Sequence, residues 1–449
     1  MAFLRSGRLE DFFTYIQPSI PLFQKEPFLR RYGQGTVNRQ LLLTLLGITA
    51  QIQGFVPLWA NTALKSSLEY LLSNNSVEEE ILENMVSLEK FQRECLLAFY
   101  EFHQYPGKKA WQRISRLTRN AYQYGMDQID NREHCSLYDH NPMTDGETEE
   151  WRCLWWCIYC LDSYCNITAA TPFVIELDSV RTALVETQGT ADSLTGVAGA
   201  IFLPAETELL WNTTKEIIAR PGDSNPNLHL VTTTLLREAG TLLRLWKQNP
   251  SARLKARFPI LEDHLSTVRL ALPTRYLDVA RNVVVNESSA EHHARLICIL
   301  HLHAARLLVS LPIQGPVNSA EWLLRWQRTL AYCEEVVAVV RQWKAQFCVS
   351  VDPAICAIVS GVLMLLHLHC KDGANTDTEL QARLRTQKDL LVLFLEQFAS
   401  IWHLPHFLIG ESSSRQPSST LKLTWCQLPS KNSQRSSPTI SHQLRLTRF

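Results

Sequence analysis

The chain has 449 residues, of which 46% are hydrophobic, so it can bury a sizeable core as one large domain or a few smaller ones. Its 44 basic and 44 acidic side chains balance, which argues against a protein that coats nucleic acid through net charge alone. The first residues contain no apolar run followed by a small-residue cleavage site. We therefore expect no secretory signal, which leaves the cytoplasm or the nucleus.

Apolar residues recur at helical spacing along most of the chain. We expect helices over residues 38–54, 77–104, 108–125, 148–165, 204–219, 228–247, 253–271, 289–311, 318–346, 353–370 and 377–403. Gly54 and the Pro106-Gly107 pair end two of these patterns, and 131–147 has the composition of a surface loop. The single mild candidate for a strand is 172–177. The predicted fold is an all-α array of about a dozen helices.

The segment 354–370 is the most membrane-like part of the chain. It is shorter than the ~20 residues that a spanning helix needs, and it ends in a sequence rich in histidine. We therefore predict a buried core helix there and no association with a membrane.

The last residues, 411–449, differ in composition from the rest. They are rich in Ser, Thr, Gln, Lys and Arg, and Glu411 is their single acid. This composition predicts a disordered basic tail. The tail is either an inert terminus or a segment for nuclear import or partner binding, although no run of four basic residues supports the second interpretation.

The most specific stretch runs over 149–175, EEWRCLWWCIYCLDSYCNITAATPFVI. Trp151, Trp155 and Ile158 share a helix face with neighbouring leucines, and further aromatic residues widen that face. This helix should therefore lie deep in the core. Asp162 near its buried end is costly unless it is paired or caps a helix end.

This stretch resembles the middle homology region of fungal zinc-cluster transcription factors, which carries an acidic residue, arginine, paired tryptophans, an aliphatic-Asp step and a Gly-Arg-Pro turn. The residues that match are Glu150, Arg152, Trp155, Trp156, Leu161, Asp162 and Pro172. Ser163 stands where an arginine commonly follows the aspartate, and Ala170-Thr171 stands where Gly-Arg is usual. The resemblance therefore leaves open the conformation of the turn and the partner of Asp162.

Flanking segments extend the resemblance. Residues 12–32 look like the family's aromatic, proline-bracketed start, and 38–50 look like its leucine-rich helix. Residues 87–125 look like its long helix, glycine-containing break and Trp-led helix, and 326–370 resemble two C-terminal helices. The resemblance implies one regulatory domain over residues 1–410, followed by the tail at 411–449.

The family's DNA-binding module holds six closely spaced cysteines around two zinc ions. The first cysteine here is Cys95, and the densest set is Cys153, Cys157, Cys160 and Cys165. One rigid helix cannot fold such a set around a tetrahedral ion, so we interpret it as core packing. We expect no metal site and no bound cofactor.

Other chemistry leaves weaker signals. His301 and His303 sit two positions apart, about 200° around a helix, which makes them poor joint ligands; the pair at His367 and His369 is the same. The cations spread over 237–257 form either a phosphate-binding stripe or, as we favour, a solvated face. No paired acid–base or nucleotide-binding motif appears, so we expect no enzyme and no catalytic residues.

The resemblance implies a nuclear transcription regulator of fungal type, with a secondary-metabolite gene cluster as its expected target. Without a zinc cluster of its own, the chain would reach DNA only indirectly, through a DNA-binding factor or a coregulator. One alternative is a sensor of a small apolar effector, favoured by a cavity near Trp155 and Trp211 and disfavoured by a filled core. Another is a truncated gene model of a DNA-binding activator.

Overall fold

The computed structural model describes residues 9–54, 58–73, 87–131, 145–186, 199–312, 319–371 and 378–414, without the side chains of 58–64 and 411–414. Within these ranges the chain is helical with irregular connections. They contain no β-strand, and the β-pairing there is an isolated bridge between Ala183 and Phe202. The predicted all-α class is confirmed.

The α-helices are α2 (Lys25–Gly33), α3 (Arg39–Gln53), α4 (Leu58–Ser73), α6 (Leu88–Gln104), α7 (Lys108–Gln123), α9 (Asp145–Ala169), α10 (Leu210–Ala219), α11 (Asn225–Gln248), α12 (Ala252–Ala271), α13 (Thr274–Leu277), α14 (Ser289–Ser310), α15 (Ala320–Arg341), α16 (Ile355–Lys371), α17 (Thr378–Ala399) and α18 (His403–Ser414). Phe12–Ile16 forms a short π-helix. Short 3₁₀ turns lie at Gln17–Ser19, Met126–Gln128, Leu177–Ser179, Thr207–Leu209, Val283–Val285 and Ala345–Cys348.

Local sequence explains several helix ends. The Asn38 side chain accepts hydrogen bonds from the first amides of α3, and Gly54 ends that helix at a φ of 68°. A capping box formed by Ser288 and Glu291 begins α14. These caps satisfy backbone groups that a helix end leaves without an intrahelical partner.

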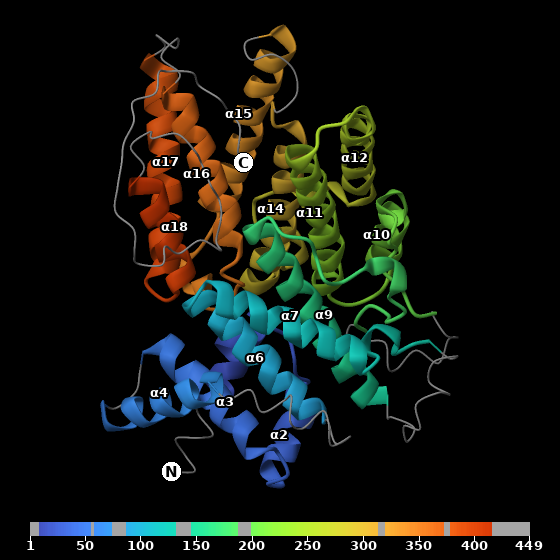
Figure 1. Cartoon of the computed structure of the whole chain (residues 1–449), viewed down its shortest axis with the longest axis vertical. Helices are drawn as coiled ribbons and strands as arrows, with labels where there is room; N and C mark the ends of the chain where they lie inside the picture. Colours follow the sequence, from blue (N-terminus) through green and yellow to red (C-terminus); the bar gives the residue numbers. More distant parts are fainter. Residues whose placement is uncertain are drawn as a thin grey trace, which may run out of the picture.

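The helices form three regions along the long axis of the molecule (Figure 1). Helices α2 to α4 lie at the N-terminal end, and α6, α7 and α9 cross the middle. Helices α10 to α12 and α14 to α18 make up the other end, where α11 packs most extensively on α14. A contiguous hydrophobic core runs through all three regions, from Leu9 to Leu408.

The C-terminal end of α6 joins the middle region to the last helices. His103 Nε2 lies 2.9 Å from Asp352 Oδ1, just before α16. The amide of Gln104 donates to the carbonyl of Ile401 at 3.0 Å, and the ring of Trp402 packs edge-on against Phe99. Both halves of the chain therefore share buried polar contacts as well as core.

The structure differs from the sequence prediction in particular elements. The chain also forms α4 and α18, which periodicity did not single out, and α9 begins at Asp145 rather than at 148. The strand expected over 172–177 is wrong: this segment is irregular and ends in a 3₁₀ turn. The predicted tail lies outside the described residues, apart from the last turn of α18.

Candidate functional site

Helix α9 is the axis of the candidate site. It runs through the middle of the molecule and packs on α6, α7 and α11 (Figure 1). Its first turn carries Asp145 and Glu147, which suit the positive end of a helix dipole. From Trp151 to Asn166 most of its side chains are buried, so the predicted core position is confirmed.

Ion pairs made by Arg31 and Arg152 fix the start of α9. Glu150 accepts a hydrogen bond from Arg31 on α2, with a nitrogen–oxygen distance of 3.2 Å. Arg152 donates its Nε to Asp130 at 3.0 Å and its Nη1 to Glu149 at 3.0 Å. These contacts tie α9 to the N-terminal helices and to the segment that follows α7.

The paired tryptophans occupy different environments. Trp155 is fully buried and packs edge-on against Tyr122, with ring centroids 5.4 Å apart. Its indole N–H has no hydrogen-bond partner among the described residues. Trp156 donates its N–H to the carbonyl of Ala183 at 2.7 Å. Trp155 thus contributes packing alone, whereas Trp156 also holds the irregular segment that follows the motif.

Asp162 forms the buried polar centre of the site. Its carboxylate accepts hydrogen bonds from the backbone amides of Val174 at 3.1 Å and Ile175 at 3.2 Å. Arg237, on α11, lies 3.2 Å from the same carboxylate. The expectation that Asp162 must be paired is confirmed by Arg237, whereas the amides that the carboxylate binds lie in an irregular segment and not at a helix end. These two hydrogen bonds also explain why 172–177 is not a strand. The backbone amides of Val174 and Ile175 bind the Asp162 carboxylate and are not available to a neighbouring strand.

Arg237 supplies the cation that the sequence motif lacks. Its Nη1 donates to the Ser163 hydroxyl at 2.9 Å, and its Nη2 donates to the carbonyl of Ile175 at 2.7 Å. Its guanidinium carbon also lies 4.0 Å from the ring centroid of Phe173 and 4.6 Å from that of Tyr159. The short side chain at Ser163 therefore accepts from an arginine of α11.

Burial raises the pKa of Asp162 above its ordinary value, and the charge of Arg237 opposes that rise. Burial also raises the pKa of Glu150, opposed by Arg31. The folded site therefore places carboxyl groups in surroundings that disfavour their charge, and the neighbouring guanidinium groups offset part of the penalty.

The turn after α9 is made without the glycine of the family pattern. Ala170 has a φ of 52°, a left-handed conformation that favours glycine. The Thr171 hydroxyl donates to the Asn166 side chain at 2.6 Å, and Asn166 also accepts from Trp111 at 3.0 Å. Pro172 follows as an exposed residue. Leu161, the remaining motif residue, is 2% exposed and belongs to the core.

The structure assigns packing roles to the cysteines of α9. Cys157 and Cys165 are buried, and Cys153 and Cys160 are partly buried. Burial raises the pKa of Cys153, Cys157 and Cys160, which disfavours the thiolate that a metal or an electrophile needs. In the described part of the chain, His, Cys, Asp and Glu form no group of three or more that could hold a metal ion.

The histidines of α14 diverge as expected. His301 Nε2 lies 3.0 Å from the Tyr164 hydroxyl, in the core. His303 Nδ1 lies 2.7 Å from Glu335 on α15. The two rings therefore meet different neighbours, and burial holds the pKa of His301 well below its usual range.

The cations over 237–257 do not form one stripe. Arg237 is buried against Asp162, and Arg257 pairs with Glu238. Lys247 is partly buried, and that burial lowers its pKa to about 8. A single phosphate-binding face is therefore not built from this segment.

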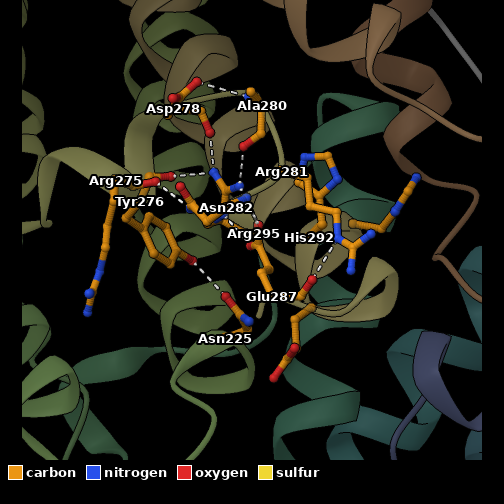
Figure 2. Close-up of polar contacts among 12 residues, drawn as sticks. Asn225, Arg275, Tyr276, Asp278, Ala280, Arg281, Asn282, Glu287, His292 and Arg295 are labelled. Carbon is orange, nitrogen blue, oxygen red and sulfur yellow. Dashed lines mark hydrogen bonds and ion pairs between the residues drawn. The ribbon is translucent and has the colours of Figure 1, made fainter. Parts of the chain in front are cut away.

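A second polar cluster, centred on Arg295 of α14, was not singled out from the sequence (Figure 2). The Arg295 side chain is buried, and its Nε and Nη2 donate to Glu287 at 2.7 and 3.0 Å. It also donates to the carbonyls of Tyr276 at 2.9 Å and Ala280 at 2.8 Å, and it contacts that of Asp278. The sequence did offer one signal for this cluster: Arg295 is a charged residue within an otherwise apolar helix, and such a residue needs polar partners when it is buried.

This cluster clamps the loop between α13 and α14. The backbone amide of Asn282 donates a hydrogen bond to Glu287 at 2.7 Å. Its side-chain amide donates to the carbonyl of Arg275 at 2.9 Å. The loop tip, which we call the valine tip, consists of Val283, Val284 and Val285, exposed by 71%, 98% and 53%. Three consecutive apolar side chains are thus exposed to solvent on a loop that several hydrogen bonds keep in one conformation.

None of the described helices is long and apolar enough to span a membrane. Residues 9–220 match the family model of the fungal specific transcription factor domain, so the resemblance is confirmed over slightly less than half of the chain. That domain is characteristic of fungal transcription regulators. Searches of curated proteins and of solved structures found no match.

Proposed function

We propose that this chain is a nuclear transcription regulator that acts through a protein partner and has neither enzymatic activity nor a resident cofactor. The match of residues 9–220 to the fungal specific transcription factor domain carries the proposal. The 449 residues contain no six-cysteine cluster, so contact with DNA through such a cluster must come from another polypeptide or from a longer form of this one. We propose the former, with a DNA-binding zinc-cluster factor or a coregulator as the partner.

The valine tip supports a role in protein contact. Isolated apolar residues on a surface need no explanation, but three adjacent valines on a well-bonded loop form a pre-shaped apolar knob. Because the loop is already ordered by Arg295 and Glu287, a partner would lose little loop entropy on binding it.

The deciding experiment is a genomic occupancy assay with the tagged chain, repeated after deletion of candidate zinc-cluster factors. Promoter occupancy that disappears with one factor supports the proposal. Val284→Asp should reduce occupancy, whereas Leu270→Asp, at an 85% exposed position on α12, should not. Absence of both occupancy and expression changes on deletion refutes the regulatory role. Occupancy independent of every such factor, together with an in-frame cysteine cluster upstream, refutes the partner mechanism.

We further propose that the target genes form a secondary-metabolite cluster, as the family resemblance implies. Transcript profiling after deletion of the gene should then show coordinated change in a contiguous set of biosynthetic genes. Changes confined to scattered genes of primary metabolism would contradict this part of the proposal.

A sensor role built on a cavity at Trp155 receives no support, because that indole is fully buried and packed against Tyr122. Trp211, the other tryptophan named for such a cavity, is partly buried against the core, and the amine of Lys215 lies 4.4 Å from its ring centroid. Any effector site must therefore be sought elsewhere in the fold.

A further inference from the structure

A groove of about 400 Å³ opens between α12, α14 and α15. Its apolar lining includes Phe258 of α12 and Val309 of α14, both buried. Phe258 also packs edge-on against Trp246 of α11, and this contact fixes the position of its ring in the lining. The volume lies within the range of sites for small molecules.

Small residues on α12 make the hollow. Ala252 and Ala256 line the groove four positions apart, on one face of the helix. A larger side chain at either position would project into the same space. The shape of the groove is therefore set by residue choice on one helix face.

Pro259 also lines the groove, in the interior of α12. Proline has no backbone N–H, so the carbonyl of Lys255, four residues earlier, lacks its usual helical donor. Lys255 lines the same groove. A backbone acceptor without its helical partner therefore belongs to the segment that forms the groove wall.

The groove carries two cations and one carboxylate. The Lys255 ammonium makes no ion pair with any described residue. The partly buried Arg325 of α15 pairs at 3.4 Å with Glu321, which is exposed. An (i, i+4) pair with one exposed partner contributes little. Glu262 lies two helical turns from Lys255, about 10 Å along the axis, where it neutralises that ammonium weakly.

We propose that this groove binds a small organic acid, with its carboxylate at Lys255 and Arg325 and its apolar body against Phe258 and Val309. The ammonium of Lys255, which has no ion-pair partner among the described residues, selects an anion, and the apolar side chains of the lining select an apolar body. The role of the groove as an effector site rests on the proposed function. Binding of an organic acid in the groove does not depend on that function.

The test is titration calorimetry of the full chain with decanoate and with decan-1-ol, its uncharged counterpart. Decanoate should bind at least about tenfold more tightly, because a hydrogen bond to a charged group contributes more than a neutral one. Lys255→Met should remove about that factor, and Lys255→Arg should restore most of it. Arg253→Met, at an exposed position in the first turn of the same helix, is the matched control and should bind as the parent does.

Two further variants separate charge from shape. Arg325→Met should weaken decanoate binding, whereas Arg328→Met, one turn further along α15 and exposed, should leave it unchanged. Ala256→Phe should abolish binding of both probes by filling the hollow. Circular dichroism of each variant verifies its fold.

Equal affinity for decanoate and decan-1-ol, or equal effects of Lys255→Met and Arg253→Met, would overturn the inference. Binding that survives Ala256→Phe would place the ligand elsewhere and overturn it as well. None of these measurements involves DNA or a partner, so a failure of the groove and a failure of the regulatory role are distinguishable.

Discussion

Replacement of Arg237 by methionine tests the polar centre of the site. Methionine keeps an apolar stem of similar length but removes the guanidinium that lies 3.2 Å from Asp162. Breaking a buried ion pair by removing one partner costs about 3–5 kcal/mol, because the remaining charge is left uncompensated. The amides of Val174 and Ile175 still donate to the carboxylate, so we expect a loss near the lower end of that range.

The assay is urea unfolding followed by circular dichroism, with Arg244→Met as the control on the same helix. Arg244 is partly buried and makes no ion pair with a described residue, so its replacement should cost less than about 1 kcal/mol. The double variant Asp162→Asn/Arg237→Met should recover part of the loss, since it leaves no buried charge.

The pH dependence sharpens the test. Burial raises the pKa of Asp162 in the folded state above its unfolded value of about 3.9, so the folded protein binds more protons between the two values. The free energy of unfolding therefore decreases as pH rises through that window. Without Arg237 the folded pKa rises further, so the destabilisation of Arg237→Met should shrink as pH falls toward 4. A destabilisation no larger than that of Arg244→Met, or one that grows in acid, would refute the reasoning.

Three further predictions concern single contacts. Ala170→Gly should raise the free energy of unfolding by about 1 kcal/mol, because the left-handed φ of 52° costs alanine but not glycine; a lower thermal midpoint would contradict this. Trp156→Phe should cost about 1 kcal/mol more than Trp155→Phe in urea unfolding, since only Trp156 donates its N–H, and equal losses would count against that assignment. Arg295→Met should make the loop that carries Glu287 susceptible to limited proteolysis, and an unchanged digestion pattern would show that the clamp is dispensable.

The sequence alone determined the class of the fold. Helical periodicity is a local property, and the signals at Asn38 and Gly54 act within one helix turn, so they can be read without tertiary information. The same holds for the core position of α9, whose apolar residues cover most of its circumference. The sequence also required a partner for Asp162, because a buried carboxylate without one is too costly to keep.

Which partner Asp162 would find was decided only by the tertiary structure. Arg237 lies 75 residues away, and no local pattern brings α11 against the end of α9. The strand expected at 172–177 failed for the same reason: its β-branched residues favour a strand, but two of its amides bind the Asp162 carboxylate.

Long-range packing also decided the surface features. The spacing of cations over 237–257 was compatible with one stripe, yet the fold buries Arg237 and leaves Lys255 unpaired beside a groove. The valine tip is exposed on a loop whose base the buried Arg295 anchors through the carbonyl of Ala280. Local propensity thus specifies helices, whereas the pairing of buried charges and the exposure of loops depend on which helices meet, and that is settled by the packing of the whole core.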